Sequence, residues 1–292
     1  MIVHLVDGTY ELFRHHFALP DHVNRDGMEV AATRGVLGSV VGLVEGGASH
    51  VGVATDHVIE SFRNALYPGY KTGEGIEPEL RNQFELLEDV LRAAGFAVFA
   101  MVEHEADDGL ATAAATAAAD PRVERVEICT PDKDLAQCVE DPRVVQVDRR
   151  KGVTYDEKGV VEKFGVPPES IADYLALVGD SADGFPGLPG WGAKSAATVL
   201  SRYGHIEAIP ADPAEWDVKV RGAAKLAATL ERERDQALLF RRIATVVTDV
   251  PGLGDVDDWR WSGPSDAFEE LCDYLELPNL PARVGRLAKA RA

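Results

Sequence analysis

The chain has few cysteines and no long apolar run. Only Cys129, Cys138 and Cys272 are cysteines among 292 residues, and their spacing shows no paired pattern, so we expect reduced thiols rather than a disulfide framework. No stretch approaches the ~20 consecutive apolar residues that cross a bilayer, and the N-terminus lacks the regions of a signal peptide. These absences predict a cytoplasmic protein without a membrane partner.

Basic residues are scarce relative to acidic ones. The chain has 30 Lys and Arg against 49 Asp and Glu, a formal net charge of −19. Such a balance argues against a nucleic-acid partner, which usually meets a basic surface. A site built from carboxylates that hold cations would itself contribute to this total, however, so the positions of the acids matter more than their sum.

Composition and length fit an ordinary globular protein. The chain is 46% hydrophobic and 27% charged, and it is long enough for a large domain or for a medium domain with a small one. In the first half, short apolar runs alternate with helical segments, which implies right-handed crossovers and a mostly parallel sheet covered on both faces. The expected strands are 2–6, 51–55, 97–102, 123–129 and 144–147.

We therefore predict an α/β domain over residues 1–168 and a small helical region over residues 169–292. An arch-like excursion is expected at about residues 57–85. The basic tail at 283–291 is either a phosphate contact or a frayed end. The helices expected after the sheet are 170–178, 193–203, 218–236 and 268–275.

Carboxylates recur just past the carboxyl ends of the predicted strands. Those ends share one edge of a parallel sheet, so we expect the acids to converge in one crevice. Ionised carboxylates gathered there repel one another, and two divalent cations about 4 Å apart would relieve the repulsion and suit phosphodiester cleavage. An all-oxygen donor set favours Mg²⁺ or Mn²⁺ over zinc. The acids are Asp7, Asp56, Glu105, Asp107, Asp108, Asp132 and Asp134, joined from beyond the sheet by Asp180 and Asp183.

Two further features bear on this site: an alternative explanation for the acids at 105–108, and a turn that follows Asp183. Glu105, Asp107 and Asp108 also suit the positive end of a helix dipole, which explains them without a metal. After Asp183, the Gly- and Pro-rich turn at 187–196 opens an Ala-rich helix. Such a turn exposes backbone amides and suits a bound phosphate.

The motifs LVDG, GYK, EADD, TPDKDL and GDSADGFPGLPGWGAKSA together resemble the 5′-nuclease family. That family includes the N-terminal domain of bacterial DNA polymerase I, phage 5′ nucleases and flap endonucleases. The resemblance runs in order from about residue 1 to 250 and implies a PIN-like sheet domain followed by a helix–three-turn–helix. It implies a metal-dependent 5′-3′ exonuclease or flap endonuclease acting on 5′ ends, nicks and flaps of DNA, RNA-primed ends included. We expect a monomer associated with the nucleoid, standing alone without a polymerase module.

The resemblance also assigns individual residues. The nine acids named above match the family's metal ligands, and Asp134 and Asp183 are assigned to catalysis as well. Lys71 matches a lysine that approaches the scissile phosphate, and Arg63 matches a phosphate-contacting arginine. Phe13 matches an aromatic residue that stacks on a terminal base, although core packing explains it equally well. The remaining expected DNA contacts are Tyr70, Gly187, Gly190, Gly192, Lys194 and Ser195, at a turn that also holds K⁺ in the family.

The chain departs from the family pattern at three positions. Glu74 stands where the family has an arginine, Gly184 where it commonly has an asparagine, and Trp191 where a smaller aliphatic residue is common. We expect the first two to weaken the grip on a 5′ flap without removing a metal ligand. Two alternatives remain: a PIN-type ribonuclease, and a catalytically weak protein that binds DNA junctions. A haloacid-dehalogenase phosphatase also has Asp-Gly-Thr after its first strand. It needs a nucleophilic aspartate two residues earlier, where this chain has Leu5, so the sequence disfavours that class.

Overall fold

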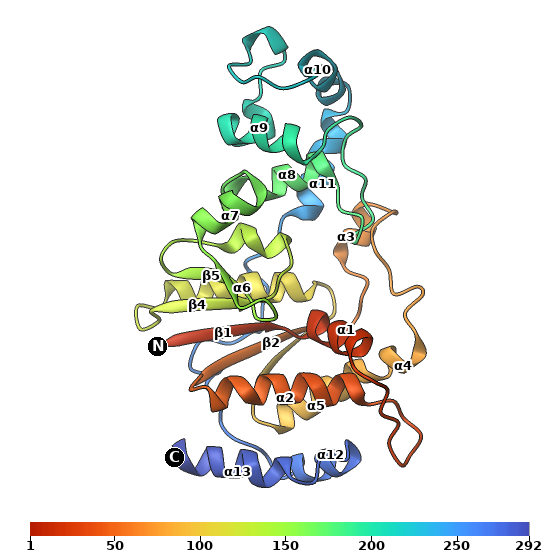
Figure 1. The fold of residues 1–292 in the computed structure, drawn as a ribbon, viewed down its shortest axis with the longest axis vertical. Coiled ribbons are helices and arrows are strands. Elements are labelled where there is room, and N and C mark those ends of the chain that lie inside the picture. Colours follow the sequence, from red (N-terminus) through yellow and green to blue (C-terminus); the bar gives the residue numbers. More distant parts are fainter. Residues whose placement is uncertain (292) are drawn as a thin grey trace. The chain divides into compact units, whose positions relative to one another are not determined.

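The computed structural model describes residues 1–291, which form two compact units. The first unit contains Met1–Ile59, Gly73–Thr130 and the C-terminal segment from Thr248. The second contains Glu60–Thr72 and Pro131–Val247. Neither unit is continuous in the sequence; the colours of Figure 1 follow the chain from its N-terminus to its C-terminus.

Four parallel strands form the centre of the first unit. In their order across the sheet they are β3 (Ala97–Met101), β2 (His50–Asp56), β1 (Ile2–Asp7) and β4 (Arg125–Cys129). Val6 of β1 lies opposite Val53 of β2 and Cys129 of β4. These strands are mostly apolar and buried, as expected for a parallel sheet covered on both faces.

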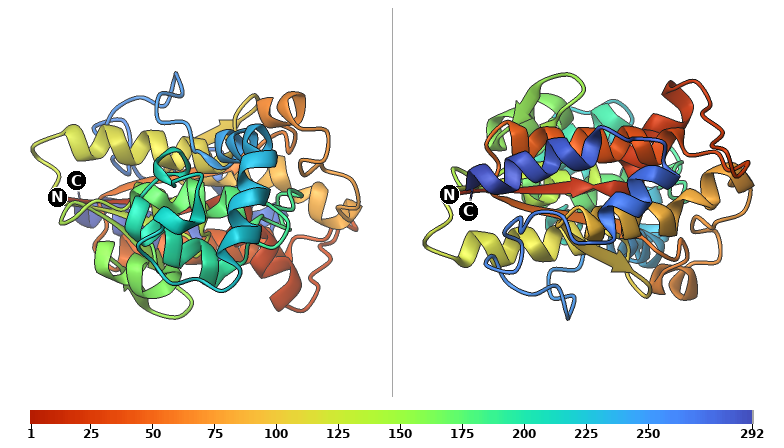
Figure 2. Two further views of the ribbon diagram at one scale, coloured as in Figure 1. Left: turned by 90° about the horizontal axis from the view of Figure 1, so that it is seen from above. Right: turned by 90° about the horizontal axis from the view of Figure 1, so that it is seen from below.

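Helices cover both faces of this sheet. The core on one face includes residues of α1 (Gly8–Ala18), α2 (Ala31–Glu45) and α5 (Gln83–Ala93), and α6 (Ala106–Ala119) packs against the strands on the other. The short α4 (Pro78–Arg81) precedes α5. Beyond α2 and α5, the C-terminal α12 (Phe268–Tyr274) and α13 (Leu280–Arg291) add a further layer, visible over α2 in Figure 2.

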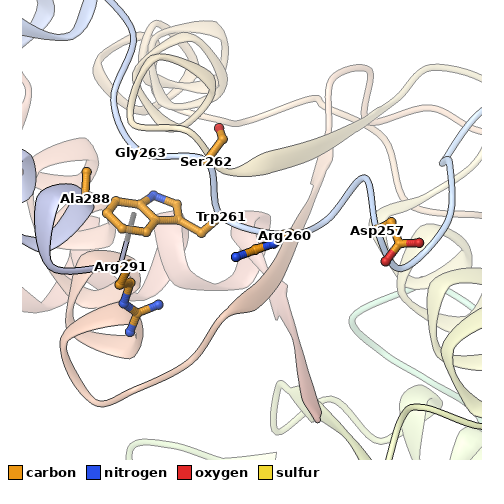
Figure 3. A pocket seen from close by; sticks show the side chains of 7 residues that line it. All are labelled: Asp257, Arg260, Trp261, Ser262, Gly263, Ala288 and Arg291. Carbon is orange, nitrogen blue, oxygen red and sulfur yellow. The ribbon is translucent and has the colours of Figure 1, made fainter.

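The C-terminal segment is fixed by contacts around Trp261. Its indole Nε1 donates to Ala94 O at 2.8 Å, and the Arg291 guanidinium lies 5.6 Å from the ring centroid. Both residues line a hollow of about 430 Å³ (Figure 3). Gly95 has φ +90°, and a Cβ there would lie 2.0 Å from Gly263 O, so this approach of two backbones requires glycine.

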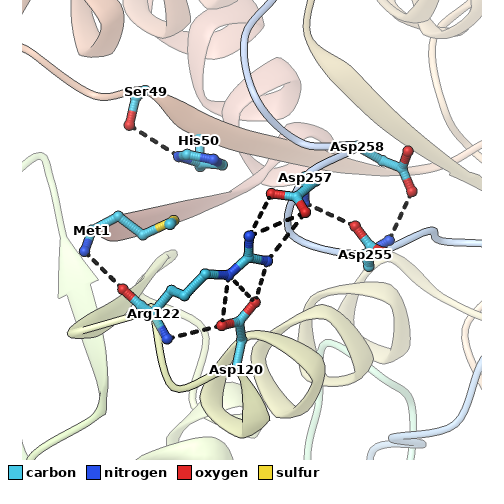
Figure 4. A network of polar contacts seen from close by, with 8 residues as sticks. All are labelled: Met1, Ser49, His50, Asp120, Arg122, Asp255, Asp257 and Asp258. Atoms are coloured by element: carbon cyan, nitrogen blue, oxygen red, sulfur yellow. Dashed lines mark hydrogen bonds and ion pairs between the residues drawn. The ribbon is translucent and has the colours of Figure 1, made fainter.

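Polar groups at the amino edge of the sheet pair with one another. The Arg122 guanidinium donates to the carboxylates of Asp120 and Asp257, and the Met1 ammonium donates to Arg122 O at 3.0 Å (Figure 4). His50, at the start of β2, is buried and lies 2.9 Å from Ser49 Oγ. Burial lowers the pKa of His50, which therefore favours the neutral form.

The second unit is mainly helical. Its core includes residues of α8, α9 and α11, and Asp173 of α8 accepts from both Arg241 of α11 and His205. Two strands, β5 and β6, pair in antiparallel fashion. The elements are α3 (Phe62–Leu66), β5 (Val144–Asp148), β6 (Val153–Tyr155), α7 (Glu157–Phe164), α8 (Ile171–Val178), α9 (Ala193–Tyr203), α10 (Ala223–Arg232) and α11 (Arg234–Ala244).

The predicted fold class is confirmed, with differences in detail. All five predicted strands are present, whereas β6 and α7 were not predicted. The single helix expected at 218–236 is wrong: α10 ends at Arg232 and α11 begins at Arg234, because Glu233 has non-helical dihedral angles. No helix within residues 1–291 is long and apolar enough to cross a membrane.

The C-terminal residues also differ from expectation. The tail at 283–291 is not frayed but forms most of α13, in which Val284 is fully buried and Arg283 pairs with Glu45. Together with α12, this helix packs into the core of the first unit instead of the predicted helical region. The division predicted at residue 168 remains a prediction.

Candidate active site

Two predicted acids lie at the carboxyl edge of the first unit's sheet. Asp7 ends β1 and Asp56 ends the neighbouring β2, and both are buried. Asp7 caps α1 by accepting from the Tyr10 N–H at 2.8 Å, and its other oxygen accepts from Thr130 Oγ1 at 2.9 Å. Asp56 accepts from the Ala106 N–H at 2.7 Å. Hydrogen bonds within the first unit therefore fix both carboxylates.

The acids that open α6 form a helix cap. The Glu105 N–H donates to Asp108 Oδ2 at 3.0 Å, and the Glu105 side chain accepts from the Asp108 N–H in return. The explanation by helix capping therefore holds for these two carboxylates. Asp107 is half-buried beside them. Metal binding by the three acids remains a prediction.

The second unit brings three predicted acids together. Oxygens of Asp134, Asp180 and Asp183 lie within 4.8 Å of one another, and all three residues are buried. Asp134 Oδ1 is buried and has no hydrogen-bond partner within residues 1–291. Asp132 is exposed beside them and accepts from the Asp134 N–H at 2.9 Å.

A tight turn holds Asp180 and Asp183 in place. Asp180 and Phe185 exchange backbone hydrogen bonds of 2.8 and 3.0 Å, and the buried Phe185 ring lies 5.5 Å from that of Phe240. Gly184 has φ +83°, and a Cβ there would lie 2.3 Å from Gly69 O. Glycine at position 184 thus follows from this turn, in which a side chain would clash with the main chain.

Two lysines contact the acidic group. Lys71 Nζ lies 2.9 Å from Asp183 Oδ1, and the Lys71 N–H donates to Asp183 O at 3.0 Å. The approach of Lys71 to a scissile phosphate remains a prediction. Lys133 Nζ lies 2.6 Å from Asp180 Oδ2, a contact that the sequence analysis missed. Its position between Asp132 and Asp134 was the available clue.

The electrostatics of the group favour a cation. Burial, followed by repulsion from Asp132, Asp183 and Asp180, raises the pKa of Asp134 well above its usual range. Burial lowers the pKa of Lys133, but its hydrogen bond to Asp180 and the surrounding acids outweigh this effect, so the pKa is raised. An all-oxygen group with an unpartnered carboxylate oxygen suits a hard divalent cation such as Mg²⁺ or Mn²⁺.

Other predicted contacts of the arch have structural partners. Arg63 is 2% exposed, and its guanidinium donates to Ile243 O at 2.7 Å and Thr245 O at 3.0 Å, at the end of α11. A phosphate would have to replace these acceptors, so the predicted phosphate contact remains a prediction. Tyr70 is buried in the second unit's core, and Glu74 is exposed.

The glycine turn places backbone close to backbone. Gly179 and Gly187 have φ +87° and +68°, and a Cβ on Gly187 would lie 2.4 Å from Gly179 N. The exposed Gly190 also has positive φ, at +88°. Ser195 closes the start of α9, because its Oγ accepts from the Gly192 N–H at 3.0 Å. Lys194 is exposed in the first turn of this helix.

The size of the Trp191 side chain is explained by its packing within the second unit. It is 6% exposed, its Nε1 donates to Leu226 O at 3.3 Å, and its ring lies 6.3 Å from that of Trp216. The indole thus joins the glycine turn to α10. Beside the turn lies a hollow of about 560 Å³, lined by Tyr67, residues 186–191, Glu233, Gln236 and Phe240.

Phe13 is a partly buried member of the first unit's core. Its ring meets that of Phe84 edge-on, with 6.0 Å between centroids. One turn further along α1, Phe17 is 73% exposed, with 6.4 Å between its ring centroid and that of Phe13. Core packing therefore explains Phe13, and its predicted stacking on a base remains a prediction.

Comparisons with known proteins match nearly the whole chain. Residues 2–165 match the family model of the 5′-3′ exonuclease N-terminal resolvase-like domain, and residues 166–267 match that of the 5′-3′ exonuclease C-terminal SAM fold. DNA polymerase I of Pseudomonas aeruginosa is 38% identical over 286 residues, which are 94% of this chain and 30% of the relative. DNA polymerase I of Mycobacterium leprae is 33% identical over 291 residues, 96% of this chain and 31% of the relative. The chain thus spans about a third of the length of these relatives.

Solved structures share the fold. The T5 5′-exonuclease with bound zinc aligns with a TM-score of 0.70 and 17% identity, covering 94% of this chain and all of that one. Flap endonuclease-1 from Methanococcus jannaschii aligns with a TM-score of 0.61 and 16% identity, covering 100% of this chain and 93% of that one. With both family domains matched in order, the chain belongs to the 5′-3′ exonuclease family.

Proposed function

We propose that the chain is a metal-dependent, structure-specific 5′-3′ exonuclease and flap endonuclease that hydrolyses phosphodiester bonds at DNA 5′ ends and flaps. The observation that carries this proposal is the buried group Asp134, Asp180 and Asp183, with the unpartnered Asp134 Oδ1. In the context of the family, such a group is best explained as a site for divalent cations. The substrates would be nicked, flapped or RNA-primed ends met by a monomer in the cytoplasm, near the nucleoid.

We infer that the acids of the first unit also bind divalent cations. Asp7 and Asp56 end neighbouring strands, and Glu105, Asp107 and Asp108 begin α6. Two bound divalent cations, Mg²⁺ or Mn²⁺, would supply positive charge and a water with a lowered pKa. The carboxylates of the first unit are proposed as ligands for such cations.

The chain's own residues would orient and neutralise the substrate. Lys71, fixed to Asp183 through both its main chain and its ammonium, would offset charge on the phosphoryl oxygens. The glycine turn would hold duplex backbone through exposed amides, with Lys194 beside it and K⁺ as a further ligand. Glu74 would weaken contact with a flap because its charge repels phosphate.

A labelled 5′-flap duplex tests the proposal. We expect cleavage with Mg²⁺ or Mn²⁺, loss of cleavage with EDTA, and loss in the double variant Asp134→Ala/Asp183→Ala. A wild type that cleaves no better than this variant would refute the enzymatic function. Matched nicked, gapped and RNA-containing substrates then separate exonuclease from flap cleavage, and DNA from RNA preference.

A further inference from the structure

Lys133 contacts the buried acidic group, and the proposed mechanism gives it no role. It is the residue between Asp132 and Asp134, and its ammonium lies 2.6 Å from Asp180 Oδ2. The other oxygen of Asp180 accepts from the Ala182 N–H at 2.9 Å. Lys133 is therefore a side-chain cation in contact with a carboxylate proposed to bind metal, as Lys71 is at Asp183.

The charges of the group show what this contact does. Asp134, Asp180 and Asp183 bring three carboxylates within 4.8 Å, and the ammonium groups of Lys71 and Lys133 each lie on a different one. When all three carboxylates are ionised, the two lysines neutralise two of the three negative charges. If one ammonium leaves, the remaining charge matches that of a single divalent cation.

The two lysines differ in their freedom to leave. Lys71 is bound to Asp183 twice, by its ammonium and by its main-chain N–H. Lys133 contacts Asp180 through its side chain, which is 35% exposed, against 28% for the side chain of Lys71. Lys133 can therefore withdraw by side-chain rotation, without moving the turn that holds Asp180.

We propose that Lys133 is the resident counter-ion of this site, holding Asp180 in the metal-free protein and competing with the divalent cation for Asp180 Oδ2. It is a positioning residue, because it acts through Asp180. This inference rests on the metal site of the proposed function. It adds that the chain itself sets how tightly the metal binds, since the same lysine that stabilises the empty site weakens metal affinity.

Titration of Mn²⁺ alone into the full, metal-stripped chain tests the inference, with binding followed by calorimetry or by the electron paramagnetic resonance of free Mn²⁺. Lys133→Gln should bind Mn²⁺ about tenfold more tightly, because a unit charge a few ångströms from the ion is removed. In EDTA the same variant should melt at a lower temperature than wild type, and Lys133→Arg should restore both properties. A merely structural lysine would not increase metal affinity when removed.

Lys158→Gln is the matched control. The Lys158 side chain is 82% exposed on α7, and its ammonium lies 3.5 Å from a carboxylate oxygen of Glu162 in the same helix. Unchanged or weaker Mn²⁺ binding by Lys133→Gln, or the same gain in the Lys158 control, would overturn the role of Lys133 while leaving the nuclease proposal intact. If wild type binds no Mn²⁺ at all, the metal site of the proposed function falls as well.

Discussion

Replacing Asp134 with asparagine should change stability in opposite directions with and without metal. In EDTA the variant removes one of three carboxylates that lie within 4.8 Å. At such a separation two unit charges repel by about 1 kcal/mol in water-like surroundings and about 3–4 kcal/mol near a protein surface. The contacts of Lys71 and Lys133 offset part of this repulsion, so Asp134→Asn should be more stable than wild type by ~1–2 kcal/mol.

Saturating Mg²⁺ should reverse the order. A ligand at a hundred times its dissociation constant stabilises the folded state by about 2.7 kcal/mol, and the variant lacks one of the carboxylates that would bind it. In EDTA the difference should also grow with pH. The raised pKa of Asp134 means that the folded protein keeps a proton which the unfolded chain has already released, so wild type loses stability as pH rises through this window.

Urea unfolding followed by tryptophan fluorescence measures both effects, because each unit contains two buried tryptophans, Trp191 and Trp216 in the second unit and Trp259 and Trp261 in the first. The exposed Asp266→Asn is the control for a simple change in net charge. Equal destabilisation of Asp134→Asn in EDTA and in Mg²⁺ would refute the reasoning, since it would mean that Asp134 neither suffers repulsion nor binds the cation.

Three further variants test other parts of the structure. Gly184→Ala should lower the free energy of unfolding by roughly 1–3 kcal/mol, because φ +83° and the close Gly69 O leave no room for a Cβ; Gly192→Ala, with open space at its Cβ and negative φ, should cost less. Trp191→Ala should cost about 3–5 kcal/mol in urea unfolding by leaving a cavity, whereas a loss below 1 kcal/mol would contradict its place in the core. His50→Gln should flatten the fall in stability as pH drops below about 6.5, because the lowered pKa of His50 leaves the folded form neutral where the unfolded chain takes up a proton; equal pH profiles for wild type and variant would contradict this.

Local patterns were sufficient for the sheet and for part of the site. Apolar runs ending in Asp7 and Asp56 predicted β1, β2 and the position of both acids, because residues of parallel strands share an edge. The glycine turn and α9 were likewise predicted from adjacent residues. Asp134, Asp180 and Asp183 were predicted to share a crevice with the other acids, and the structure of the second unit confirms that these three lie together.

Interactions between distant segments were out of reach of such patterns. The Arg63 guanidinium donates to carbonyls at Ile243 and Thr245, which no local motif indicates, and its predicted phosphate contact remains a prediction. No local pattern indicates the contact of Lys133, because its partner, Asp180, lies in another motif. Gly184 was recorded as a departure from the family, and only the approach of Gly69 explains it.

The return of the C-terminal segment to the first unit has a consequence for how the chain folds during synthesis. Phe268 and Cys272 are at most 1% exposed within the same core as α2 and α5, which precede them by many residues. The ribosome therefore releases α2 and α5 well before α12 and α13, the helices that pack against them. Until then, apolar surface on α2 and α5 is open to solvent and to chaperones. Ending the chain at the boundary between the two family domains would make that exposure permanent.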